Sequence, residues 1–140
     1  MALRKPLVQI GGELGELPAG DILNVGPWIT SFVPTITTSV GSITSLAYNV
    51  SRYIQIGKVV IYLSNFAIST NGTGAGEIRL TLPVPMNGTF YNGAGFDGTN
   101  LKLLGVYIPA AAYMALTLYD GTYPGVNGHS YTSTIVYEAA

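Results

Sequence analysis

Residues that carry acid, base or nucleophilic chemistry are few in this sequence and match no catalytic motif. His129, the only histidine, lies in the turn-like stretch 126–130, where its imidazole would act as a base toward a neighbouring serine. A serine triad also needs an orienting carboxylate and an oxyanion hole, and no Gly-x-Ser-x-Gly elbow is present. One histidine without any cysteine falls short of the three or four protein ligands of a zinc site. We therefore expect no catalytic residue, no metal ligand and no cofactor.

Three carboxylates leave one hydrolytic arrangement open, because paired acids that converge in space cleave glycosidic bonds. Glu77 lies in an alternating strand pattern, whereas Asp97 and Asp120 each precede a glycine in a turn and are too isolated for a calcium site. The glycine-rich stretch 72–76 leads into a strand and lacks the Gly-Lys-Thr/Ser ending of a phosphate loop, which indicates a hairpin tip. The sequence thus favours a protein that is not an enzyme.

The composition excludes several classes of partner. Only 9% of the 140 residues are charged, against about 25% in ordinary globular domains, and the net charge is −1. Nucleic-acid binding needs a surplus of positive charge, which this chain does not have. The apolar stretch 103–119 is shorter than the ~20 residues of a spanning helix and contains Pro109. We expect neither a nucleic-acid nor a membrane partner.

The sequence pattern predicts that the elements that position these residues are all β-strands. Residues 77–82 alternate polar and apolar, which predicts that Ile78, Leu80 and Leu82 face the core. Gly57 and Lys58 separate two strand-like runs, 52–56 and 59–63, as in a tight hairpin. Further strands are predicted at 29–38, 43–48, 101–108, 113–119 and 131–137. No stretch has a sustained helical period, so we expect an all-β protein, an antiparallel β-sandwich of jelly-roll or Greek-key type, over residues 27–140.

Residues 1–26 differ from the rest and predict an extended N-terminal arm. They hold five of the thirteen charged residues and are interrupted by glycines and prolines. Apolar residues in such a segment have no core of their own, so they become ordered by docking on a partner surface. The candidate partner-binding residues are Leu7, Val8, Ile10, Leu14, Leu17, Ile22 and Leu23.

The stretch 5–12 (KPLVQIGG), followed by 16–23 (ELPAGDIL), resembles an N-terminal signature of tail-fibre and other virion proteins of tailed bacteriophages. The resemblance to these virion proteins continues through Trp28, FVPTIT at 32–37, YIQIGKVV at 53–60 and LTLP at 80–83. It covers roughly residues 5–83. It implies a β-sandwich protein of the virion, assembled in the bacterial host cytoplasm. It does not choose among virion roles, and it carries over no catalytic residue.

The short chain has no long attachment and shaft region, which favours a capsid cement or decoration protein over a complete fibre. The expected partners are the major capsid protein or another virion protein, and further copies of the chain in a dimer or trimer. The alternative is the receptor-binding tip of a tail fibre. In that case the segments 86–100 and 120–130 would hold host glycan against tyrosines, with Tyr91, Tyr119, Tyr123 and Tyr131 as candidates.

Overall fold

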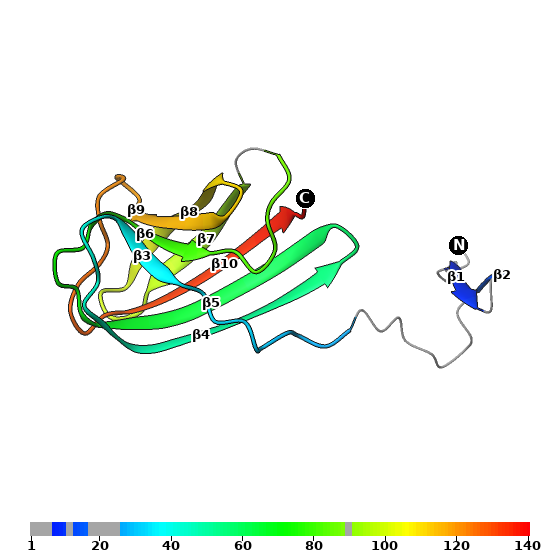
Figure 1. Ribbon diagram of the computed structural model, residues 1–140, viewed down its shortest axis with the longest axis horizontal. Helices are drawn as coiled ribbons and strands as arrows, with labels where there is room; N and C mark the ends of the chain where they lie inside the picture. Colours follow the sequence, from blue (N-terminus) through cyan, green and yellow to red (C-terminus); the bar gives the residue numbers. More distant parts are fainter. Residues whose placement is uncertain (1–6, 11–12, 17–25, 89–90) are drawn as a thin grey trace.

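The computed structural model describes residues 26–88 and 91–140 in full and residues 7–10 and 13–16 as backbone (Figure 1). Its regular structure is entirely β-strand in these residues, which confirms the all-β class. The strands are β1 (Leu7–Ile10), β2 (Glu13–Glu16), β3 (Ile36–Val40), β4 (Ser45–Ile56), β5 (Val59–Thr70), β6 (Ala75–Thr81), β7 (Tyr91–Asp97), β8 (Lys102–Ala110), β9 (Tyr113–Leu118) and β10 (Ser130–Glu138).

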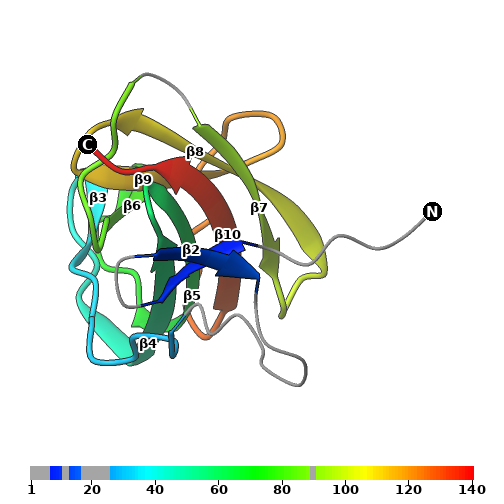
Figure 2. The same ribbon diagram turned by 90° about the vertical axis from the view of Figure 1, so that its right-hand side faces the viewer.

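Eight of these strands form a single antiparallel sheet in the order β3-β6-β9-β8-β7-β10-β5-β4. The sheet curls until its two edge strands, β3 and β4, lie on the same side of the molecule (Figure 2). Residues 29–35 connect these edges. Ile29 exchanges backbone hydrogen bonds of 2.8 and 3.0 Å with Tyr53 of β4, and Thr81 of β6 donates its backbone N–H to Thr35 at 3.1 Å. The curled sheet is thereby closed around one core.

The core follows the alternation of side chains along each strand. Ile78, Leu80 and Leu82 are buried, as their spacing predicts, while the intervening residues of β6 face outward and are half-buried. Phe66 of β5 stacks on Tyr131 of β10 with ring centroids 5.1 Å apart. The other fully buried large side chains are Tyr62, Tyr137, Ile68, Ile108, Met114, Leu116, Ile135 and Val60.

The hairpin around Gly57 and Lys58 is confirmed, and its strands are longer than predicted. Two predicted strands, 43–48 and 52–56, are one strand, β4, with irregular register only near its start. The polar residues between them resemble a turn in the sequence but bind the neighbouring segment: the Asn49 side chain donates to the Pro34 carbonyl at 2.7 Å. Ser51 Oγ donates to the Phe32 carbonyl at 2.6 Å. For the same reason the predicted strand 29–38 is reduced to β3, because its first half lies along the edge of β4.

Strand β7 was not predicted, because Asn92, Gly93 and Gly95 resemble loop residues. The glycines are required by close packing of the backbone. A Cβ at Gly93 would lie 2.3 Å from the carbonyl oxygen of Thr134 on β10, and one at Gly95 would lie 2.9 Å from Val106. Glycine in a strand often marks such an approach of a second backbone.

The glycine-rich stretch 72–76 is not a hairpin tip, because β5 and β6 are not neighbours in the sheet. It belongs to a crossover that packs against the connection from β3 to β4. Thr73 donates its backbone N–H to the Ser42 carbonyl at 3.1 Å. Gly41 has a φ of +70°, and a Cβ there would lie 2.0 Å from the Thr73 carbonyl oxygen, so only glycine fits.

Within the predicted arm, β1 and β2 form a separate two-stranded antiparallel sheet. Their register runs from Leu7 opposite Glu16 to Ile10 opposite Glu13. An isolated two-stranded hairpin is at best marginally stable in water. The division into an arm of residues 1–26 and a body of residues 27–140 stays a prediction.

Candidate functional site

Four of the seven predicted partner-binding residues belong to the β1–β2 hairpin. Leu7, Val8 and Ile10 belong to β1, and Leu14 belongs to β2. Only their backbone is described, and Leu17, Ile22 and Leu23 lie outside the described residues. Their role in binding a partner therefore stays a prediction from the sequence.

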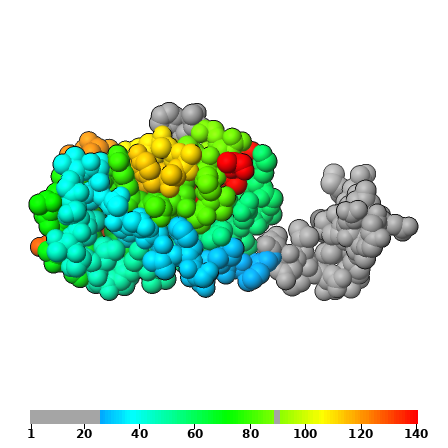
Figure 3. Space-filling view, in the orientation of Figure 1, coloured from blue at the N-terminus to red at the C-terminus, as the bar shows by residue number. Residues whose placement is uncertain are grey.

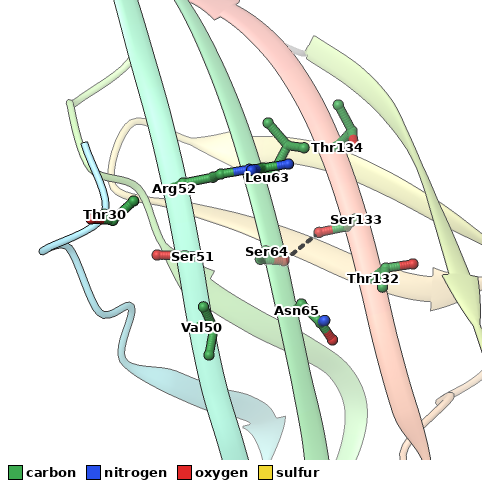
Figure 4. Close-up of a pocket in the computed structure, with 10 residues that line it drawn as sticks. All are labelled: Thr30, Val50, Ser51, Arg52, Leu63, Ser64, Asn65, Thr132, Ser133 and Thr134. Atoms are coloured by element: carbon green, nitrogen blue, oxygen red, sulfur yellow. Dashed lines mark hydrogen bonds between the residues drawn. The ribbon is translucent and has the colours of Figure 1, made fainter. Parts of the chain in front are cut away.

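The body has a shallow groove across the outer face of β4, β5 and β10, with a volume of about 430 Å³ (Figure 4). A second hollow of about 240 Å³ continues it over β7 and β8 and shares the stretch 132–134 of β10. The two hollows therefore form one surface that crosses five neighbouring strands. We call this surface the outer groove; its lining side chains include Thr30, Val50, Arg52, Leu63, Asn65, Ala94, Phe96, Leu103, Thr132 and Thr134.

The lining of the outer groove mixes apolar and polar side chains and is uncharged except at one position. Val50 is 61% exposed and Leu103 is 71% exposed, at its two ends. Threonine hydroxyls and the Asn65 amide supply hydrogen-bonding groups between them. Arg52 is the single charged residue of the lining, and its guanidinium lies 5.2 Å from the centre of the Trp28 ring. This surface can hold apolar side chains, accept and donate hydrogen bonds, and neutralise one anionic group.

Beneath the groove, on the core side of the sheet, lies a row of three serines. Ser51 is opposite Ser64, and Ser64 is opposite Ser133, so the three lie across β4, β5 and β10. All three are buried, and the hydroxyls of Ser64 and Ser133 are 2.6 Å apart. These hydroxyls are satisfied by one another and by backbone, which makes them structural. The alternation of β5 places Ser64 on the same face as the buried Tyr62 and Phe66, which is the sequence signal for this row.

His129 has a carboxylate partner that the sequence did not identify. Its Nδ1 lies 2.9 Å from Oδ2 of Asp97, and both side chains are buried. Asp97 Oδ1 also accepts backbone N–H bonds from Thr99 at 3.0 Å and Asn100 at 3.1 Å. Burial raises the pKa of Asp97, but the bonds from Asn100, His129 and Thr99 outweigh it and lower the pKa below its usual value.

An Asp–His pair supplies two of the three residues of a serine triad. It is catalytic only when a nucleophilic hydroxyl is hydrogen-bonded to the histidine. Among the described residues, no serine or threonine hydroxyl is hydrogen-bonded to the His129 ring. The ring instead lies beside Tyr131, with centroids 6.3 Å apart. The pair joins the turn after β7 to the long connection before β10, and we interpret it as a structural clamp.

The other two acids considered for hydrolysis also have local partners. Glu77 binds Arg79 through a 2.6 Å ion pair and accepts the Tyr107 hydroxyl at 2.5 Å, which raises the pKa of Tyr107 to about 12. Asp120 accepts the hydroxyl and the backbone N–H of Thr122 within one turn. Each carboxylate is thus engaged in its own neighbourhood rather than paired with another acid.

The four tyrosines considered for glycan binding do not form one aromatic platform. Tyr119 is 88% exposed, but Tyr131 is fully buried and donates its hydroxyl to the Pro124 carbonyl. Tyr123 is half-buried and donates to Asn71. Tyr91 begins β7, at the other end of that strand from Asp97, and packs against Tyr137. The segment 86–100, predicted as a loop, contains β7 itself.

Comparison with known proteins adds no assignment: no family model, no curated protein and no solved structure matches this chain. In the part of the chain that the structure describes, no helix is long and apolar enough to cross a membrane. No group of three or more histidine, aspartate or glutamate residues is placed to hold a metal ion in that part.

Proposed function

We propose that this protein is a non-enzymatic structural component of a tailed-bacteriophage particle, a cement or decoration protein that binds and stabilises the head. The observation that carries the proposal is a set of exposed apolar side chains on the outer face of the sheet. Large apolar patches on a soluble protein mark contact with another protein. The exposed apolar side chains of this face are Val50, Ile56, Val59, Phe96, Leu103 and Val136, all between 36% and 71% exposed.

The assignment to a phage particle rests on the resemblance of residues 5–83 to virion proteins. The proposed partners are the major capsid protein or another virion protein, together with further copies of this chain as a dimer or trimer. The low charge supports this choice, because only 9% of residues are charged and contacts between subunits are the usual place to bury apolar surface. The arm supplies the residues that become ordered on the partner, and the protein resides in the virion after assembly in the bacterial cytoplasm.

We further propose that the fold is a Greek-key sandwich. Strands β7, β8 and β9 follow one another as neighbours, and β10 returns to lie beside β7, which is the strand order of a Greek key. In the proposed sandwich, β3-β6-β9-β8 and β7-β10-β5-β4 of this single curled sheet would be the two four-stranded halves. Such a body has few exposed strand edges, which suits a protein packed in many copies.

A receptor-binding role at a fibre tip is the second candidate, favoured by one observation. Tyr119 is 88% exposed in the long connection between β9 and β10, where an aromatic ring is available to stack on a sugar. Under this alternative the partner is a glycan of the host surface, and the protein is present in few copies.

Quantitative mass spectrometry of purified particles separates the two roles. A decoration protein is present in copies on the order of hundreds, because the head offers many symmetry-related positions. A fibre tip is limited to a few tens of copies. A protein that is missing from purified particles contradicts both roles.

A further inference from the structure

The outer groove contains one positive charge, that of Arg52, for which the described body supplies no carboxylate partner. Arg52 lines the groove, and it forms no ion pair with any residue of the described part of the chain. Its guanidinium lies 5.2 Å from the centre of the Trp28 ring, and its side chain extends across the groove toward Leu63 (Figure 4). An occupant of this surface should therefore combine apolar side chains with at least one carboxylate.

Among the acidic side chains of the body that the structure describes, each has a partner near it, which leaves the arm as the other source of acidic side chains in the sequence. The sequence has seven acids, and the four in the body all have local partners in the structure. These are Glu77 with Arg79, Asp97 with His129, Asp120 with Thr122 and Glu138 with Lys58. The remaining three are Glu13, Glu16 and Asp21, and they are interspersed with the apolar residues of the arm.

The β1–β2 hairpin contains both apolar and acidic residues, as an occupant of the groove should. It also needs a surface on which to pack. Its strands hydrogen-bond only to each other among the described strands, and each has four residues. A hairpin of this size needs a surface to pack on in order to be stable. Glu13 and Glu16 flank Leu14 in β2, so the segment brings apolar and acidic residues together.

The direction of the chain indicates which copy supplies the arm. Residues 26–35 lie along the edge of β4 and run, toward the N-terminus, to the tip of the β4–β5 hairpin (Figures 1 and 3). Thr30 and Trp28 border the groove, and a chain that continued in this direction would pass the hairpin tip, so an arm would have to reverse to cover the groove of its own body. Glu16 precedes Pro27 by eleven positions, which span at most about 40 Å when extended. That length would allow the hairpin to cross to a second copy in contact with the first.

We propose that the outer groove binds the arm of a second copy of this chain, with Arg52 facing Glu13, Glu16 or Asp21. The inference rests on the proposed role of the arm as a binding element and names the surface that receives it. Reciprocal exchange of arms gives a closed dimer, and exchange around a ring gives a trimer. Apolar residues of the arm would cover Val50, Leu63 and the neighbouring apolar side chains of the groove.

Charge reversal tests the Arg52 contact with the full-length protein. Sedimentation equilibrium should show association of the wild-type chain that Arg52→Glu weakens at least about tenfold. Lys58→Glu is the matched control, because it makes the same charge change in the β4–β5 turn, outside the groove, and it should leave association unchanged. Adding Glu13→Arg and Glu16→Arg to Arg52→Glu should restore association. A wild-type monomer, equal effects of the two reversals, or no rescue would overturn the inference.

Disulfide trapping identifies the copy that donates the arm, because the chain has no cysteine of its own. Leu14→Cys in the arm and Asn65→Cys in the groove are placed on separate chains and mixed under mild oxidation. The expected product is a covalent dimer of the two variants, whereas Leu14→Cys mixed with Tyr119→Cys should give none. A doubly substituted chain that closes on itself at low concentration, with no dimer, would refute exchange.

These experiments use purified protein alone, so their failure is separable from failure of the proposed function. A chain that is a monomer in solution and abundant in particles contradicts arm exchange and keeps the virion role. A chain that exchanges arms and is missing from particles contradicts the virion role and keeps the exchange.

Discussion

Replacement of Asp97 tests the interpretation of the Asp97–His129 pair as a structural clamp. The carboxylate is 2% exposed and accepts three hydrogen bonds, from Thr99, Asn100 and His129. Asp97→Ala leaves these donors without an acceptor in a buried place, which should cost about 3–5 kcal/mol of unfolding free energy. Asp97→Asn keeps an acceptor oxygen for the turn and should cost about 1–2 kcal/mol. Urea unfolding followed by far-UV circular dichroism measures both values.

The pH dependence of the same variants has a definite sign. The pKa of Asp97 is lowered in the folded protein, because its hydrogen bonds outweigh the opposing effect of burial. A group with a lowered folded pKa stabilises the protein fully above its unfolded pKa, which is about 4 for aspartate. The difference in unfolding free energy between wild type and Asp97→Asn should therefore be largest near neutral pH. It should narrow as the pH falls below about 4, through the folded pKa.

Asp120→Ala is the matched control for this series. Asp120 also accepts hydrogen bonds within a turn, from Thr122, but it is exposed, so its replacement should leave the urea midpoint unchanged. Equal losses for the two alanine variants would refute the clamp. So would a gap that widens as the pH falls, since that sign requires a raised pKa in the folded protein.

Three further substitutions test the packing by denaturant titration. Leu80→Ala should cost about 2–5 kcal/mol, because Leu80 is fully buried, whereas outward-facing Thr81→Ala loses one exposed hydrogen bond from Thr35 and should cost at most about 1 kcal/mol. Ser64→Ala should cost about 1–3 kcal/mol by leaving the Ser133 hydroxyl unpaired, and adding Ser133→Ala should recover part of that loss. Leu101 has a φ of +55°, so Leu101→Asn should raise the unfolding free energy by up to about 1 kcal/mol.

Local patterns predicted the strands whose residues alternate cleanly. Ile78, Leu80 and Leu82 were placed in the core by spacing alone, and the tight turn at Gly57 and Lys58 followed from turn chemistry. In these elements each residue's environment is set by its near neighbours in sequence. Local propensity is therefore sufficient to describe them.

Features that depend on distant residues were not predictable in the same way. Strand β7 has glycines because Thr134 and Val106 approach its backbone, and those neighbours are far away in sequence. The Asp97–His129 pair joins residues 32 positions apart, so each residue alone resembled an ordinary turn residue. The outer groove arises only when β4, β5, β10, β7 and β8 lie side by side, an order that no local pattern contains.

Incorporation of an arm-deleted protein into particles tests the central claim most directly. A chain beginning at Gly26 is supplied alongside the full-length protein during phage assembly, and both are quantified in purified particles. We predict that the truncated protein still gives the circular dichroism spectrum of a folded β-sheet body and is missing from the particles, because the arm carries the binding residues. Occupancy equal to that of the full-length protein would contradict the account.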